Sequence, residues 1–143
     1  MIKNQTTIQR EIVFCGIGLH TGVETNMKFK PALENTGIVF LRIDQTEAVE
    51  IKASLENVIE TNRGTTLGSR NIKVYTVEHV LSALYALNID NLIIEIDNIE
   101  PPIFDGSSKK FVDEIIKSGR KELNSKRKYL KITKTINFYD EKS

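Results

Sequence analysis

The sequence has 143 residues, of which 40% are hydrophobic and 27% charged, and its formal net charge at pH 7 is +1. This composition is typical of one soluble globular domain with its own core, and the balanced charge gives no support for binding to nucleic acid or to an anionic membrane. No apolar run approaches the ~20 residues that span a bilayer and the N-terminus lacks a signal-peptide core, so we expect a cytoplasmic protein without stable membrane insertion.

Short strands dominate the first part of the predicted structure. The segment 6–22 predicts a strand that runs into a glycine-rich loop, with Ile8, Ile12 and Phe14 on one face. The segment 23–31 alternates apolar and polar residues and predicts the second strand of a hairpin around that loop. Further strands are predicted over 37–43 and 49–55, over two parts of 61–76 with a break near 68–71, and over 91–98. The single Cys15 excludes an internal disulfide and a cysteine-based zinc site.

Two helices are predicted in the second half of the chain. Thr76 is a good N-cap residue for a helix over 77–88. The apolar residues of this helix share one face: Val77, Val80, Leu81, Leu84 and Leu87. Small residues occupy the opposite side, so we expect one side to meet the domain's own sheet and the other a second partner. The second helix is predicted over 108–118, with Ser107 as its N-cap and Gly119 just after its end.

The composition changes near the end of the second helix. The segment 117–128 is rich in basic residues and holds one acidic residue, which favours a solvated linker over a phosphate-binding patch. The segment 129–139 is rich in β-branched and aromatic residues and predicts a strand or strand pair. We therefore expect three parts: a domain over 1–120, a basic linker over 121–128, and the start of a truncated second domain over 129–143.

Glu78 and His79 form the pair with the clearest catalytic chemistry. Neighbours in a helix point about 100° apart, so the two side chains do not face each other, but they can flank one small site. A neutral imidazole can bind zinc, and a nearby carboxylate can act as a general base. Zinc needs about three protein ligands, however, and this spacing supplies one. On spacing alone, a first-turn glutamate beside a structural histidine is the favoured interpretation.

Three loops carry the other polar candidates. The loop 16–22 holds His20 but lacks the lysine and the following helix of phosphate-binding loops, so its glycines are expected to supply positive φ angles. His20 is then a surface residue or a binding residue. The segment 61–66 fits an edge strand or the wall of a polar site. Turn and cap chemistry is expected around Asp105.

Taken together, several segments occur in the order and approximate spacing of one known family. They are GIGLHTG (16–22), ENTGIVFLRID (34–44), ETNRGTTLG (60–68), TVEHVLSALYALNIDNLIIEID (76–97) and EPPIFDGSSKKFV (100–112). From about Gln5 to Phe138 the chain resembles the N-terminal half of the UDP-3-O-acyl-N-acetylglucosamine deacetylases, zinc enzymes of lipid A biosynthesis. Its RGTTLG variant is similar to the branch in which this deacetylase is fused to a 3-hydroxyacyl-carrier-protein dehydratase.

The resemblance implies roles for matching residues. His79 would be a zinc ligand, and Glu78 would be the general base that takes a proton from zinc-bound water for attack on the acetamide of UDP-3-O-acyl-N-acetylglucosamine. His20 would lie at the edge of the substrate. The mouth of the active site would be lined by the segment that holds the remaining expected substrate-binding residues: Thr61, Arg63 and Thr65.

The family's remaining zinc ligands and catalytic groups belong to a C-terminal domain. No histidine follows His79 in this sequence. The chain alone is therefore expected to lack a complete zinc site and to be inactive until that missing domain supplies the other ligands.

The resemblance also implies an α+β fold with two layers. A mostly antiparallel sheet would be covered on one face by the two helices, as in the second domain of ribosomal protein S5. In the whole enzyme, two such domains would pack helices against helices around the active site. The alternative is a non-catalytic binding module of the same fold, for nucleic acid or protein, because fold alone does not give function. A nucleic-acid module needs a coherent basic face, whereas the basic residues here concentrate in one segment.

Overall fold

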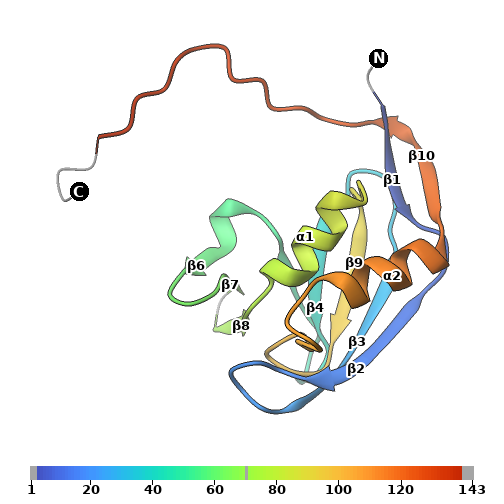
Figure 1. Ribbon diagram of the computed structural model, residues 1–143, viewed down its shortest axis with the longest axis vertical. Helices are drawn as coiled ribbons and strands as arrows, with labels where there is room; N and C mark the ends of the chain where they lie inside the picture. The colour runs from blue at the N-terminus through green and yellow to red at the C-terminus, as the bar shows by residue number, and fades with distance from the viewer. Residues whose placement is uncertain (1–2, 70, 140–143) are drawn as a thin grey trace.

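The structure is a computed structural model that describes residues 3–69 and 71–139 (Figure 1). Its strands are β1 (Asn4–Ile8), β2 (Ile12–Ile17), β3 (Glu24–Pro31), β4 (Ile38–Arg42), β5 (Val49–Lys52), β6 (Val58–Glu60), β7 (Thr66–Ser69), β8 (Ile72–Val74), β9 (Leu92–Ile96) and β10 (Arg120–Lys126). Its helices are the short 3-10 helix η1 (Leu55–Asn57), α1 (Glu78–Ala86) and α2 (Lys109–Ser118).

A mixed, mostly antiparallel sheet forms the centre of the fold. Its strands follow the order β2-β3-β9-β4-β5, and only β4 and β9 run parallel. Along β3, the buried residues Thr25, Met27 and Phe29 alternate with more exposed neighbours. Both α-helices lie on the same side of this sheet (Figure 1). The expected α+β fold is confirmed.

Aromatic packing fixes α2 against the sheet. The ring of Phe111 lies 5.1 Å from that of Phe14 on β2 and 6.3 Å from that of Phe29 on β3, measured between centroids. Phe104, in the loop before α2, lies 5.4 Å from Phe111. Each fully buried phenylalanine contributes about 1.5–3 kcal/mol through removal of apolar surface from water. This cluster sets the path of the loop between β9 and α2.

Helix α1 buries one face and exposes the other. Val80 and Leu84 are buried, whereas Tyr85 is 88% exposed. The predicted N-cap is wrong: Val77 occupies that position, and Thr76 has a φ of 51° and directs its hydroxyl elsewhere. No described part of the chain packs against the outer face, which leaves it accessible to the second partner expected from the sequence.

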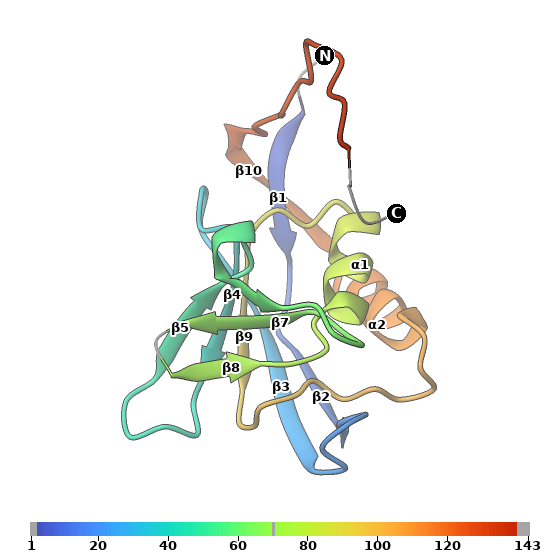
Figure 2. The ribbon, with the colours of Figure 1, turned by 90° about the vertical axis from the view of Figure 1, so that its left-hand side faces the viewer.

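A small sheet lies beside the central one. Its order is β6-β7-β8, and β7 packs near β5 (Figure 2). Strands β7 and β8 agree with the two strands predicted there, while β6 was not predicted. Residue 70, inside the predicted break, lies outside the described residues. This sheet brings the segment 61–65 to the start of α1 (Figure 2).

The basic segment after α2 pairs with the beginning of the chain. Strand β10 runs antiparallel to β1, with Ile8 opposite Arg120 and Asn4 opposite Lys126. The sequence predicts one strand through β1 and β2, but the chain breaks after Ile8, and β1 and β2 join different sheets. The structure thus differs from the expected solvated linker, because the backbone of 120–126 finds a partner in β1 and Leu123 is buried. The domain boundaries themselves stay predictions.

The segment 127–139 contains no helix or strand. The strand or strand pair predicted over 129–139 is therefore wrong for these residues. Leu130 and Phe138 are 96% and 87% exposed. A strand needs a neighbour for its backbone groups, and no described strand pairs with this segment, which extends away from the folded body (Figure 1).

Candidate functional site

The start of α1 holds Glu78 in a fixed orientation. One oxygen of its carboxylate, Oε2, accepts a hydrogen bond of 3.0 Å from the backbone N–H of Thr65. The carbonyl of Thr65 in turn accepts a 3.3 Å bond from the N–H of Val77. The other oxygen, Oε1, has no hydrogen-bond partner among residues 3–69 and 71–139. Glu78 is thus anchored through one oxygen and free to bind water or a ligand through the other.

His79 follows on the next position of the helix and is half-buried. Its carbonyl accepts a hydrogen bond of 3.0 Å from the Ser82 hydroxyl, while its imidazole has no bonded partner within the described ranges. Such an imidazole is a suitable metal ligand. Within the described residues, however, no group of three or more His, Cys, Asp or Glu side chains is placed to hold a metal ion. The role of His79 as a zinc ligand therefore stays a prediction.

Glu100 organises the loop that carries His20, and the sequence did not identify it. Its side chain follows β9 and is fully buried. Oε2 accepts hydrogen bonds from the backbone N–H of His20 at 3.0 Å, from the N–H of Thr21 at 2.9 Å and from the Thr21 hydroxyl at 3.0 Å. Oε1 accepts from the Thr76 hydroxyl at 2.6 Å and lies 3.0 Å from Nδ1 of His20. The only local signal for this role is the position of Glu100 directly before two prolines, and a second acid, Asp97, lies between it and the buried strand.

These donors keep Glu100 ionised. Burial by itself raises the pKa of the carboxyl, but hydrogen bonds from Thr76, Thr21 and His20 outweigh it and lower the pKa from 4.5 to about 2. A buried carboxylate is tolerated when donors surround it. Glu100 therefore fixes the position of the His20 loop relative to the start of α1.

Thr76 stands in an unusual backbone conformation. Its φ of 51° lies in the left-handed region, where a β-branched residue is strained. Next to it, the N–H of Tyr75 donates a 2.8 Å hydrogen bond to the carbonyl of Ile99. These two contacts, one from the hydroxyl of Thr76 and one from the backbone of Tyr75, join the turn before α1 to the turn after β9.

A pocket of about 270 Å³ lies between the His20 loop and the segment 60–66. It is lined by His20, Glu60, Asn62, Arg63, Gly64, Thr66, Tyr75 and Thr76. A Cβ atom added to Gly64 would lie 3.3 Å from Oε1 of Glu78, so the free carboxylate oxygen borders this pocket. Of the residues expected to bind substrate, His20 and Arg63 share the pocket. Thr65 contacts Glu78 through its backbone, and Thr61 is exposed outside the lining.

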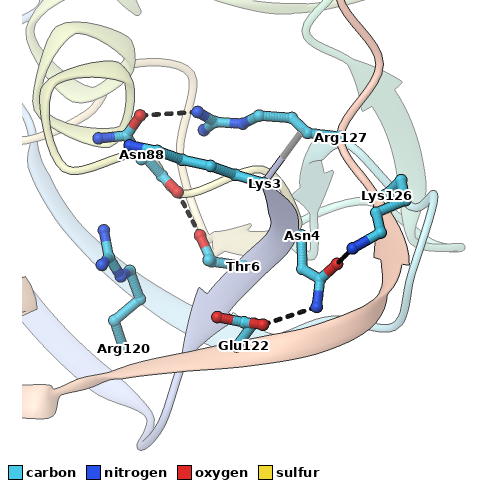
Figure 3. A pocket seen from close by; sticks show the side chains of 8 residues that line it. All are labelled: Lys3, Asn4, Thr6, Asn88, Arg120, Glu122, Lys126 and Arg127. Carbon is cyan, nitrogen blue, oxygen red and sulfur yellow. Dashed lines mark hydrogen bonds between the residues drawn. The ribbon is translucent and has the colours of Figure 1, made fainter. Parts of the chain in front are cut away.

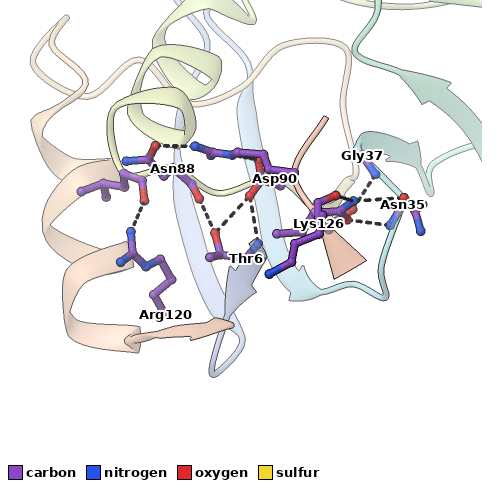
Figure 4. A network of polar contacts seen from close by, with 11 residues as sticks. Thr6, Asn35, Gly37, Asn88, Asp90, Arg120 and Lys126 are labelled. Carbon is purple, nitrogen blue, oxygen red and sulfur yellow. Dashed lines mark hydrogen bonds and ion pairs between the residues drawn. The ribbon is translucent and has the colours of Figure 1, made fainter. Parts of the chain in front are cut away.

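A second hollow, of about 250 Å³, lies along β1 and β10 (Figure 3). It is lined by Lys3, Asn4, Thr6, Asn88, Arg120, Glu122, Lys126 and Arg127. Arg127 donates to the side chain of Asn88 at 2.7 Å (Figure 3) and to that of Asp90 at 2.6 Å. Asp90 and Arg120 lie in the same polar network (Figure 4), where Arg120 donates to the carbonyl of Leu87 at 3.1 Å. These guanidinium groups link the C-terminal end of α1 to the β1–β10 pair through hydrogen bonds. They give no support to a phosphate-binding patch.

The comparisons with known proteins identify the family of this α+β domain. Residues 5–143 match the family model described as UDP-3-O-acyl N-acetylglycosamine deacetylase, LpxC. The chain belongs to this family. The resemblance found in the sequence motifs is confirmed.

Two relatives show how much of such a protein this chain covers. It is 47% identical over 144 residues to the bifunctional enzyme LpxC/FabZ of Chlorobaculum tepidum. The aligned region covers all of this chain and 31% of that protein. It is also 43% identical over 136 residues to the UDP-3-O-acyl-N-acetylglucosamine deacetylase of Geotalea uraniireducens. Here the aligned region covers 95% of this chain and 44% of that protein. The chain therefore spans less than half the length of these curated relatives.

The bifunctional name belongs to the Chlorobaculum relative. A fused dehydratase in this protein stays a prediction. Across 3–69 and 71–139, no helix has the length and apolar character needed to cross a membrane.

Proposed function

We propose that the chain is the N-terminal half of a zinc-dependent amidohydrolase that removes acetate from UDP-3-O-acyl-N-acetylglucosamine in lipid A biosynthesis, and that it acts in the cytoplasm. The observation that carries the proposal is the family match over residues 5–143. The position of Glu78 and His79 side by side at one helix start supports it, because a base and a metal ligand must serve the same small site.

The chemistry of these side chains fits one edge of a zinc site. The unbonded imidazole of His79 offers a nitrogen ligand, and we assign the remaining ligands to a C-terminal domain. Zinc bound there would polarise the acetamide carbonyl and acidify a water molecule. The carboxylate of Glu78 would then take the proton of the attacking water on Oε1, the oxygen that Thr65 leaves free.

The remaining steps follow from that proton transfer. The water oxygen bonds to the acetamide carbon, the C–N bond breaks, and acetate leaves as one product. The proton held by Glu78 passes to the departing amine, so the carboxylate is restored.

We place the polar part of the substrate in the pocket that His20 and Arg63 share. A guanidinium binds phosphate oxygens through paired N–H donors, which suits the diphosphate of a UDP-sugar. The backbone of Thr65 would position the base, and Thr61 would lie at the outer rim.

A chimera tests this function. This chain replaces the matched segment of the Geotalea deacetylase, and acetate release from UDP-3-O-acyl-N-acetylglucosamine is measured. We expect turnover, and we expect Glu78→Gln to lower kcat by about 10²–10⁴-fold because the general base is lost. The matched control is Glu50→Gln on the exposed side of β5, which should leave kcat unchanged. A folded chimera without acetate release, or equal rates for both variants, would contradict the proposal.

A further inference from the structure

The two oxygens of Glu100 share one donor, the backbone N–H of His20, which lies 3.0 Å from Oε2 and 3.3 Å from Oε1, and differ in their other partners. Oε2 receives the backbone N–H groups of His20 and Thr21 and the hydroxyl of Thr21. Oε1 receives the hydroxyl of Thr76 and lies within hydrogen-bond distance of Nδ1 of His20. A backbone N–H can only donate, so the atom at the Oε2 position must be a hydrogen-bond acceptor.

We propose that Glu100 is a positioning residue that fixes His20 as the tautomer with hydrogen on Nδ1, so that Nε2 is the nitrogen offered to ligands in the adjoining pocket. An ionised carboxylate only accepts hydrogen bonds, so a contact of 3.0 Å with Nδ1 requires hydrogen on that nitrogen. The second neighbour of Nδ1 is the hydroxyl oxygen of Thr76, at 3.1 Å. That hydroxyl already gives its hydrogen to Glu100, so it too can only accept from Nδ1.

The other ring nitrogen faces a different environment. Nε2 of His20 has no hydrogen-bond partner in the part of the chain that the structure describes, and the side chain is 46% exposed. The imidazole lines the pocket that also holds Arg63. In the neutral ring, Nε2 carries a lone pair and accepts a hydrogen bond from a hydroxyl or amide N–H of a ligand, such as a sugar hydroxyl. This property belongs to the chain itself and requires neither metal nor hydrolysis.

Glu100→Gln gives a sharp test, because the amide has one acceptor and one donor. The amide oxygen is expected at the Oε2 position, because the Thr21 N–H and hydroxyl donate only there and the His20 N–H is closer to it, at 3.0 Å against 3.3 Å to Oε1. The NH₂ group then takes the Oε1 position and donates toward Nδ1 of His20. The variant should therefore invert the tautomer and move the hydrogen of His20 to Nε2.

Long-range ¹H–¹⁵N spectra of the ¹⁵N-histidine-labelled chain at pH 9 report which ring nitrogen carries hydrogen. A His79→Gln variant assigns the signals of the two histidines. We expect Nδ1–H for His20 in the wild type and Nε2–H in Glu100→Gln. The control Thr21→Val removes a donor from Oε2 and weakens the same cluster, yet it leaves the contact with Nδ1 and should keep Nδ1–H.

The wild-type spectrum tests the proposal even if a variant fails to fold. Nε2–H for His20 in the wild type would overturn it. So would a folded Glu100→Gln variant that retains Nδ1–H. Neither result bears on the metal or on acetate release, so failure of this inference is distinct from failure of the proposed function.

Discussion

The Thr76 hydroxyl donates a hydrogen bond of 2.6 Å to the carboxylate of Glu100, and this contact ties the turn before α1 to the turn after β9. The same carboxylate holds the backbone of His20 and Thr21. One buried charge thus orders the histidine loop and the approach to Glu78. Removal of the acceptor, as in Glu100→Ala, would leave these donors without a partner, so the loop and the turn are expected to lose order together in that variant.

Glu100→Gln is expected to remove part of the pH dependence of stability. The folded-state pKa of about 2 lies below the reference value of 4.5, so the ionised carboxylate stabilises the fold above about pH 4.5 and loses that effect as the pH falls toward 2. The shift corresponds to about 3 kcal/mol at neutral pH. Urea unfolding should show the stability gap between wild type and variant shrinking by about 2 kcal/mol from pH 7 to pH 3. A gap of equal size at both pH values would contradict this role.

Gly18→Ala should disturb the same cluster from the other side. A Cβ atom at Gly18 would lie 2.5 Å from the hydroxyl oxygen of Thr21 and 2.6 Å from Oε2 of Glu100. We expect a loss of about 1–3 kcal/mol in the free energy of unfolding, because a packed site must shift. We also expect weaker pH dependence below pH 4.5.

The control for that substitution is Gly22→Ala. A Cβ there meets nothing within 4 Å, and the residue has a φ of +64°. This variant should lose about 1 kcal/mol from backbone strain and keep the wild-type pH dependence. Identical pH profiles for the two alanine variants would show that Gly18 does not act through Glu100.

Asp90→Asn should reveal how firmly the β1–β10 pair is joined to α1. Asp90 accepts from Arg127 at 2.6 Å and from the N–H of Thr6 at 2.9 Å, and the side chains of Asp90 and Arg127 are 19% and 20% exposed. We expect a loss of about 1–2 kcal/mol in urea unfolding, since a part-buried charged pair is broken. Asp113→Asn breaks an exposed pair with Lys109 and should cost less than about 0.5 kcal/mol. Equal losses would contradict a structural role for this segment.

Local patterns predicted the helices closely because periodic apolar residues report burial directly. The helix predicted over 108–118 is observed over Lys109–Ser118, and Ser107 still accepts a 3.2 Å hydrogen bond from the N–H of Lys109 although the N-cap is Ser108. Asp105 accepts from Ser107 as turn chemistry suggested. These contacts all lie within a few residues of one another.

Long-range pairing could not be predicted in the same way. Strand β10 is mostly polar, and its partner β1 stands at the other end of the sequence. Glu100 binds residues far earlier in the chain, so no spacing reveals its role. The residue type of Thr76 predicts an N-cap, yet its hydroxyl donates its hydrogen to Glu100. In each case the hydrogen-bond partner is brought close by the fold and cannot be identified from the neighbouring sequence.

The outer helical face should make the isolated chain self-associate. Tyr85 on α1 and Ile116 on α2 are 88% and 63% exposed. Exposed apolar patches favour association in water, and under the proposed function this face would meet the second domain. Light scattering should show a mass that rises with concentration, and Tyr85→Glu with Ile116→Glu should reduce it. A clean monomer at high concentration would contradict this expectation.

The most direct measurement of the central claim is zinc content and acetate release, determined together for this chain alone and for the chimera with the Geotalea deacetylase. We expect the chain alone to retain less than one zinc per molecule after gel filtration and to release no acetate from UDP-3-O-acyl-N-acetylglucosamine. We expect the chimera to retain about one zinc and to turn over, because His79 and Glu78 then meet the other ligands. Stoichiometric zinc with turnover by the chain alone would contradict the claim that it carries only part of the site.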